Sequence, residues 1–182
     1  MRYIDLPVGD QAPDIFNIVV EIPRGSANKY EYDIKLNIFR LDRTLYSPMH
    51  YPGDYGFVPS TMAADGDPLD VLVMVESPSF TGCIIEARAI GMLAMVDQGK
   101  EDLKILCVPT RDPRSETLQN YQDVHPHRLR EIEHFFSIYK ELEGKSTETN
   151  GWYGADKAKN AVSAAIDRFK QGAGIRDQGP GI

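Results

Sequence analysis

The feature that most constrains this chain is an acidic turn that leads directly into an apolar strand. Asp65, Asp67 and Asp70 lie within six residues, and Gly66 and Pro68 between them favour a tight turn followed by extended backbone. The next five residues, Val-Leu-Val-Met-Val, are typical of a buried strand. Three carboxylates held this closely repel one another unless a cation lies between them. Their oxygens suit Mg²⁺, Mn²⁺ or Ca²⁺.

An acidic turn of this kind is also common as a solvated surface loop, so the turn alone does not establish a function. It is a poor match to the Ca²⁺-binding EF-hand loop, which carries Gly at its sixth position and Glu at its twelfth. Counted from Asp65, the sixth residue is Asp70 and the twelfth is Glu76, with a strand between them. The function must therefore be sought in the acidic turn together with other residues.

Length and charge narrow the class of protein. With 182 residues, of which 42% are hydrophobic, the chain is long enough for one sizeable core, so we expect a single domain over 1–182. The Gly-rich residues 171–182 are expected to form a flexible tail. A formal net charge of -7 argues against a protein that reads the nucleic-acid backbone. An anionic substrate is compatible with this charge only if bound metal reverses the local sign.

The apolar segments and the two cysteines indicate where in the cell the protein is located. The first residues lack the apolar region of a secretory signal, and no apolar stretch approaches the length of a membrane span. Cys83 and Cys107 each stand alone in strand-like segments, which is typical of reduced thiols in a core. We therefore expect a cytoplasmic protein with no membrane partner.

The hydrophobic pattern changes period near Pro109. Before it, alternating or apolar runs predict strands over 15–22, 29–33, 36–41, 71–75, 83–96 and 103–108. The strands over 29–33 and 36–41 are expected to form a hairpin around Lys35, and the strand over 83–96 is expected to bend at Gly91. Residues 50–59 read as a loop or an irregular strand, and Asn37 suits a left-handed turn position. After it, helical spacing predicts helices over 128–143 and 155–170. Short strands followed by helices indicate an α+β fold, a small β-barrel with two C-terminal helices packed outside it.

A second acidic cluster lies between two predicted strands. Asp97 ends one strand and Asp102 begins the next, with Gln98, Glu101 and Lys104 beside them. Taken alone, this segment is typical of a charged surface hairpin. Asp70 also lies at a strand end, however, and a barrel could bring all three carboxylates to one site.

Taken together, these segments resemble the soluble family I inorganic pyrophosphatases. The run Asp65-Gly66-Asp67-Pro68-Leu69-Asp70-Val71 matches the D-x-D-P-x-D-V motif of that family. Weaker matches, in chain order, are Glu21-Ile22-Pro23, Lys29-Tyr30-Glu31, Asp42-Arg43, Tyr51-Pro52 with Tyr55-Gly56, Asp97 with Glu101-Asp102-Leu103-Lys104, and His134-Phe135-Phe136 leading to Tyr139-Lys140. The ordered set is specific although its members are not. The length is similar to that of the short prokaryotic members.

The resemblance implies an OB-like five-stranded β-barrel with additional strands, and Mg²⁺-dependent hydrolysis of pyrophosphate to two phosphates. Several Mg²⁺ ions per site are implied, with Mn²⁺ or Zn²⁺ as possible substitutes. Two bridging metals can lower the pKa of an attacking water and neutralise the phosphoryl group. By resemblance, Asp65, Asp70 and Asp102 bind the metal pair that flanks this water.

The resemblance also assigns the remaining acidic residues. Asp97 joins Asp102 on a metal that arrives with substrate, while Glu21 and Glu31 belong to the outer acidic lining. Asp67 resembles the residue that acts as general base toward the attacking water or orients it.

Cationic and phenolic side chains are then expected to bind the phosphates. Those that match the family are Lys29, Arg43, Tyr55, Lys104, Tyr139 and Lys140. An Arg can bind two phosphate oxygens with its planar fork, while a Lys acts as a point charge. Each of these residues also has an ordinary structural explanation. The assignments of Lys104 and Lys140 to phosphate binding depend most on the resemblance.

Two positions depart from the family pattern, and alternatives remain open. Gln98 stands where many members carry Glu, and Asp54 stands where Asn often precedes the Tyr-Gly pair; we expect altered metal affinity or pH dependence from them.

A haloacid-dehalogenase-type phosphatase would need a buried strand before Asp65. An acidic OB-type module that binds metal without catalysis is the second alternative. By resemblance, the short members form hexamers of two stacked trimers.

Overall fold

The computed structural model describes residues 1–176, and its centre is a closed ring of five strands. Around the ring the order is β1 (Ile15–Ile22), β4 (Asp54–Val58), β5 (Leu69–Val73), β7 (Lys100–Pro109) and β6 (Ile84–Asp97), and β6 pairs with β1 to close it. The β5–β7 pairing is parallel and the other four are antiparallel. The five-stranded barrel expected for the chain is confirmed.

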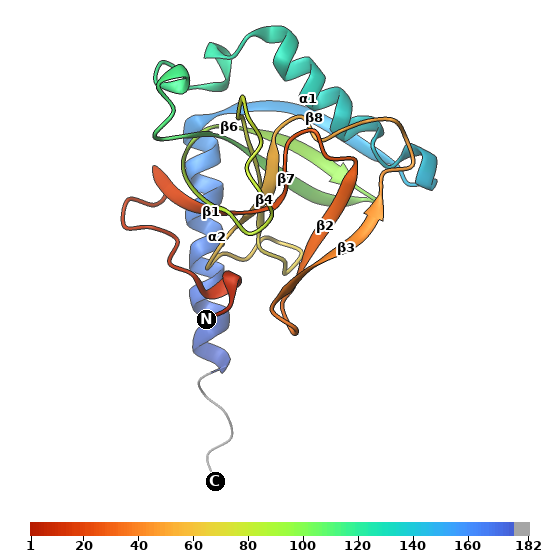
Figure 1. Cartoon of the computed structure of the whole chain (residues 1–182). Helices are drawn as coiled ribbons and strands as arrows, with labels where there is room; N and C mark the ends of the chain where they lie inside the picture. The colour runs from red at the N-terminus through yellow and green to blue at the C-terminus, as the bar shows by residue number, and fades with distance from the viewer. Residues whose placement is uncertain (177–182) are drawn as a thin grey trace.

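The remaining elements surround this ring. β8 (Thr147–Gly154) pairs with the second half of β6, and β2 (Asn28–Asp33) and β3 (Ile38–Thr44) form a separate hairpin. The two helices, α1 (Pro126–Ile138) and α2 (Ala155–Arg176), lie on different sides of the ring (Figure 1). Short 3₁₀ helices cover Tyr3–Asp5, Pro113–Ser115, Tyr121–Asp123 and Glu141–Glu143. Within residues 1–176, no helix has the length and apolar character that crossing a membrane requires.

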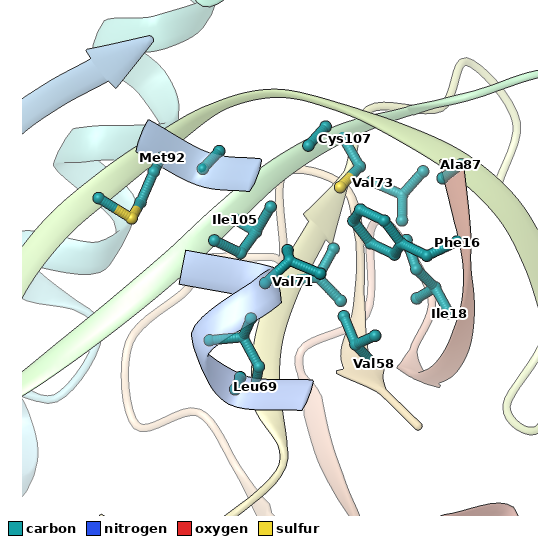
Figure 2. Packing of buried hydrophobic residues seen from close by; sticks show 14 of the residues in the cluster. Phe16, Ile18, Val58, Leu69, Val71, Val73, Ala87, Met92, Ile105 and Cys107 are labelled. Carbon is teal, nitrogen blue, oxygen red and sulfur yellow. The ribbon is translucent and has the colours of Figure 1, made fainter. Parts of the chain in front are cut away.

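Strand alternation divides the buried residues between two cores. In β5, Val71 and Val73 face a core that contains side chains from every strand of the ring and from α2, shown in Figure 2. Leu72 between them faces a second core, which α1 closes with Ile132 and Phe136. Apolar residues on both faces therefore hold β5 rigidly, and the residues at its start are fixed with it.

The segment 50–59, expected to be a loop or an irregular strand, contains the regular strand β4, in which all five residues are buried. Its glycine is required by packing and does not interrupt the strand. A Cβ at Gly56 would lie 1.9 Å from the backbone oxygen of Val19 on β1, so only glycine permits this approach of the two strands.

The β-hairpin and the bend in the long strand agree with the sequence-based expectations. β2 and β3 pair from Asn28–Thr44 to Asp33–Ile38, and Asn37 has a left-handed φ of 56°. The register of β6 against β7 shifts between Ala89 and Gly91, where the chain was expected to bend.

Three expectations about the C-terminal half are wrong. β8 was not predicted, because its polar and glycine residues lack a clear apolar alternation. The helix expected to run to Glu143 ends at Ile138 and gives way to a 3₁₀ turn, after which Gly144 has a left-handed φ of 71°. The helix expected to end at Lys170 continues to Arg176. Residues 171–176 of the expected tail therefore lie in this helix, and residues 177–182 lie outside the described residues.

Candidate active site

A cavity of about 660 Å³ lies where the acidic turn, the strand ends of the ring and the β2–β3 hairpin meet. Of the thirteen expected site residues, twelve line this cavity. They are Glu21, Lys29, Glu31, Tyr55, Asp65, Asp67, Asp70, Asp97, Asp102, Lys104, Tyr139 and Lys140. Arg43 is the expected residue that does not line it. Side chains that are up to 119 positions apart in the sequence thus share one cavity.

The parallel pairing of β5 with β7 creates the cavity wall. Val71 lies opposite Ile105, so Asp70 and Lys104, one position earlier on each strand, are neighbours on the opposite face from these apolar residues. Asp102 lies two positions before Lys104 and therefore on the same face. Alternation along β7 thus buries its apolar residues while it points Asp102 and Lys104 into the cavity.

Lys104 is the centre of this wall, with only 4% of its side chain exposed. Its ammonium donates to the Asp70 carboxylate, to Asp102 at 2.6 Å and to the Tyr55 hydroxyl at 3.0 Å. Burial alone would lower the pKa of Lys104, but the charges of Asp70 and Asp102 raise it above its ordinary value. Since an ammonium has three N–H donors, all the donors of Lys104 are used.

Tyr55 completes this network from β4. Its hydroxyl accepts from Lys104 and donates to Asp70 at 2.6 Å. Burial, followed by the nearby charges of Asp70 and Asp102, raises the pKa of Tyr55 well above its ordinary value. The phenol is therefore neutral at any physiological pH.

The acidic turn itself is held by its own hydrogen bonds. The backbone N–H of Asp67 donates to the Asp65 carboxylate at 3.1 Å, and the N–H of Ala63 donates to the Asp67 carbonyl at 2.7 Å. Gly66 has a φ of +96°, which favours glycine. The N–H of Leu69 donates to the Thr61 hydroxyl at 3.0 Å and fixes the start of β5. The turn presents its carboxylates from a defined backbone.

Several carboxyl groups in the cavity have a raised pKa. Burial raises the pKa of Asp67, and the charges of Asp65 and Asp70 add to the shift. Burial also raises the pKa of Asp102, against the opposing charge of Lys104. For Glu21, burial raises the pKa to about 8, although the N–H of Tyr32 donates to its carboxylate at 2.8 Å. These shifts indicate more negative charge than the cavity neutralises by itself.

Lys140 and Asp97 form the far side of the cavity. Lys140 directly follows the end of α1 and donates to the Asp97 carboxylate at the end of β6. The other oxygen of Asp97, Oδ1, is buried without a hydrogen-bond partner. A buried carboxylate oxygen left in this way requires a cation or a donor from outside the chain. Tyr139, beside Lys140, is buried, and its burial raises the pKa of its phenol.

The comparisons with known proteins agree with this geometry. Residues 18–170 match the family model described as inorganic pyrophosphatase. The chain belongs to this family. It is 48% identical over 158 residues to an inorganic pyrophosphatase of Halalkalibacterium halodurans, which spans 87% of this chain and 97% of that protein. It is 52% identical over 158 residues to one from a Nostoc species, with 87% of this chain and 94% of that protein covered.

Solved structures support the same assignment. The inorganic pyrophosphatase from Thermus thermophilus superposes with a TM-score of 0.91 at 44% identity, covering 93% of this chain and 99% of that one. The one from Helicobacter pylori gives a TM-score of 0.87 at 35% identity, with 91% and 98% covered. The resemblance noted from the sequence is confirmed. The chain is a hydrolase that cleaves the phosphoanhydride bond of pyrophosphate, and the non-catalytic alternative is not favoured.

The haloacid-dehalogenase alternative conflicts with the order of elements. That chemistry needs a strand that ends at the first Asp of the motif. Residues 59–64 form no strand, whereas β5 follows the motif.

Membership of the pyrophosphatase family implies a divalent metal cofactor, and the cavity fits one. Its lining contains eight acidic and five basic residues, so negative charge is in excess. Among residues 1–176, no three His, Cys, Asp or Glu side chains already converge on one point as a ready-made metal site. Lysines lie between the carboxylates instead. The unpartnered Oδ1 of Asp97 and the raised carboxyl pKa values indicate where a cation would stabilise the site. Oxygen donors of this type are those that Mg²⁺ prefers.

Arg43 lies beside the cavity, on β3, opposite Lys29 of β2. Its guanidinium forms ion pairs with Asp42 and with Glu143, the latter at 2.6 Å. Lys29 itself pairs with Glu31 and, at 3.7 Å, with Asp42. The hairpin thus carries two cationic side chains to the cavity edge.

The two positions that depart from the family pattern behave differently. Gln98 lines the cavity and has a φ of 49° in the turn after β6. Asp54 is buried and does not line the cavity, because its carboxylate accepts from the N–H groups of Arg24 at 2.8 Å and Ser79 at 3.0 Å. Asp54 therefore joins two loops, and the expectation of an effect on the site applies to Gln98 alone.

Two further basic residues in the lining were not predicted. Lys100 is the first residue of β7, and Arg168 lies on the exposed face of α2. The guanidinium of Arg168 donates to the carbonyl of Met62 at 3.0 Å, next to the acidic turn. No sequence signal distinguishes Arg168 from other charged residues on the polar face of a helix.

Proposed function

We propose that this cavity hydrolyses inorganic pyrophosphate with Mg²⁺ as cofactor, and that Asp67 is the general base. The observation that carries this proposal is the convergence of twelve expected residues on one acidic cavity. Asp65, Asp70 and Asp102 would hold the metal pair beside the attacking water. Asp97 and Asp102 would hold an ion that arrives with the substrate, and Glu21 and Glu31 would contribute to the outer acidic lining.

Bound Mg²⁺ supplies two effects that side chains alone do not: it lowers the pKa of water and neutralises phosphate charge. Asp67 is suited to accept a proton from that water. It lies on the exposed acidic turn, and its carboxylate is free of ion pairs with Lys or Arg within residues 1–176. Burial and the neighbouring carboxylates raise its pKa, which makes it a stronger base than an ordinary Asp.

Binding of the substrate phosphates is assigned to Lys29, Lys140 and Arg43, with Lys104, Tyr55 and Tyr139 beside them. Lys104 and Tyr55 have their donors committed to Asp70 and Asp102. They can turn toward a phosphate once these carboxylates are neutralised by a cation. Loading with cations and binding of substrate are therefore expected to favour each other.

Phosphate release measured by malachite green tests the activity. We expect release from pyrophosphate that requires Mg²⁺ and stops with a chelator. Mn²⁺ or Zn²⁺ should replace Mg²⁺ in part, whereas Ca²⁺, with its larger and looser coordination, should inhibit. The absence of release above background from a folded protein with Mg²⁺ would refute the proposal.

We also propose that this chain forms a hexamer of two stacked trimers and is located in the cytoplasm, as its resemblance to the short members of the family implies. Light scattering on the purified chain tests the hexamer directly. A monomer or dimer at assay concentrations would refute it without affecting the chemistry assigned to the cavity.

A further inference from the structure

Glu143 is a nearly buried carboxylate outside the cavity lining, with 6% of its side chain exposed. It lies in the 3₁₀ turn Glu141–Glu143, three residues after Lys140. Its Oε1 accepts from Nε of Arg43 at 2.6 Å, and its Oε2 accepts from Lys145 at 3.2 Å. Burial opposes its ionisation, but these two hydrogen bonds lower the pKa of Glu143 below its ordinary value. Glu143 is therefore a permanent anion beside Arg43.

Two of the three guanidinium nitrogens of Arg43 donate hydrogen bonds, and the third has no partner. Nε donates to Glu143, and Nη1 donates to Asp42. Nη2 is buried and has no partner. A buried, charged N–H group without an acceptor is unfavourable, and an anionic acceptor removes that penalty. Phosphate oxygens are acceptors for which a guanidinium has the right geometry.

The Arg43–Glu143 pair also connects two elements that bring cations to the cavity. Arg43 lies on the β2–β3 hairpin opposite Lys29, and Glu143 lies in the turn that follows Lys140. The hairpin otherwise forms a sheet separate from the ring. The ion pair therefore fixes the hairpin to the end of α1.

We propose that Glu143 is a positioning residue for substrate binding: it holds the Arg43 guanidinium through Nε beside the cavity, in the orientation from which Arg43 can bind a phosphate of pyrophosphate. This inference rests on the proposed function, since it takes Arg43 as a phosphate ligand. Because Glu143 acts through Arg43 and not on the reacting atoms, its loss should weaken binding of pyrophosphate more than it slows turnover.

Steady-state kinetics of Glu143→Ala and Glu143→Gln test this inference. For Glu143→Ala we expect KM for pyrophosphate to rise about tenfold while kcat changes by less than about twofold. Glu143→Gln keeps an acceptor for Nε and the size of the side chain, so it should recover about half of this loss on a logarithmic scale. Glu141→Ala, an exposed residue of the same turn, is the matched control and should leave KM unchanged.

The same substitution in an Arg43→Ala background separates positioning from general support of the fold. We expect Glu143→Ala to have no further effect on KM there, because its target is absent. An unchanged KM for Glu143→Ala, or an equal rise in both backgrounds, would overturn the inference. Failure of the proposed function would appear differently, as a lack of phosphate release by the unaltered protein.

Discussion

The acidic turn that carries Asp65 and Asp67 and the strand wall around Lys104 hold their carboxylates in opposite ways. On the wall, Asp70 and Asp102 share the buried ammonium of Lys104, and all three N–H donors of that ammonium are used. On the turn, Asp65 and Asp67 are exposed, and no ion pair within residues 1–176 joins them to Lys or Arg. The wall is therefore partly neutralised from inside the chain, whereas the carboxylates of the turn have no such internal counter-charge.

This difference teaches how one cavity can be both stable and reactive. A wall of unpaired buried carboxylates would destabilise the fold, because buried charges require partners. A turn with every carboxylate paired to a lysine would have no base left for catalysis. The four predictions below test this division, from the largest expected effect to the smallest.

Asp67→Asn removes the free base of the turn and should have the largest effect. We expect kcat to fall about 10²- to 10⁴-fold, the usual contribution of a general base. Metal binding, measured by titration calorimetry with Mg²⁺, should persist because the assigned ligands remain. Asp167→Asn, an exposed position on α2, is the matched control. Full activity of Asp67→Asn would show that the base lies elsewhere.

Lys104→Met removes the internal cation of the wall. Asp70 and Asp102 then face each other without a cationic partner. We expect the free energy of unfolding to be about 2–3 kcal/mol lower than that of the parent in the absence of metal. Added Mg²⁺ should restore part of this loss, since it would neutralise the same carboxylates. Urea unfolding with and without Mg²⁺ measures both effects, with the exposed Lys157→Met as control. Equal stability of variant and parent without metal would contradict the importance of this pairing.

Glu21 gives the cavity a defined pH dependence in the absence of metal. Burial raises the pKa of Glu21 from 4.5 to about 8. Between these two pH values the folded chain therefore keeps the Glu21 proton, whereas the unfolded chain has lost it. Stability from this group is therefore complete below the ordinary pKa of 4.5, falls as pH rises from there, and is fully lost once pH has passed through about 8.

Glu21→Gln should remove this dependence and make the metal-free chain about 1–2 kcal/mol more stable than the parent at high pH. The glutamine retains an acceptor for the Tyr32 N–H. Urea unfolding at pH values on both sides of the shifted pKa measures the change, with the exposed Glu148→Gln as control. A parallel pH profile for parent and variant would show that Glu21 does not carry the effect.

Gln98→Glu should give the smallest change. It adds a carboxylate to the cavity near Asp97, and a partly solvated charge of this kind contributes less than about 1 kcal/mol. We expect the Mg²⁺ concentration for half-maximal activity to fall by up to about fivefold. An increase in that concentration would mean that residue 98 does not face the metal.

Much of the ring could be predicted because its strands carry clear apolar patterns. The strand predicted over 15–22 has the bounds of β1, and the carboxylates at strand ends meet in one cavity as expected. Asn37 was correctly placed in a turn because few other residues adopt its left-handed φ readily.

What the sequence did not reveal depends on contacts between distant segments. Residues 50–59 were expected to form a loop or an irregular strand, whereas Gly56 within them allows β4 to approach β1. The pairing of Lys104 with Asp70 follows from the parallel register of β5 and β7, which no local pattern specifies. The ion pair between Arg43 and Glu143, one hundred positions apart, was likewise beyond local patterns.

A crystal structure of the chain with Mg²⁺ and a non-hydrolysable pyrophosphate analogue tests the central claim most directly. We predict Mg²⁺ within about 2.1 Å of oxygens from Asp65, Asp70 and Asp102, with the analogue between these ions and Lys29 and Lys140. Ions bound elsewhere, with Lys104 still joining Asp70 and Asp102 and no ligand in the cavity, would contradict the claim that these carboxylates form the catalytic metal site.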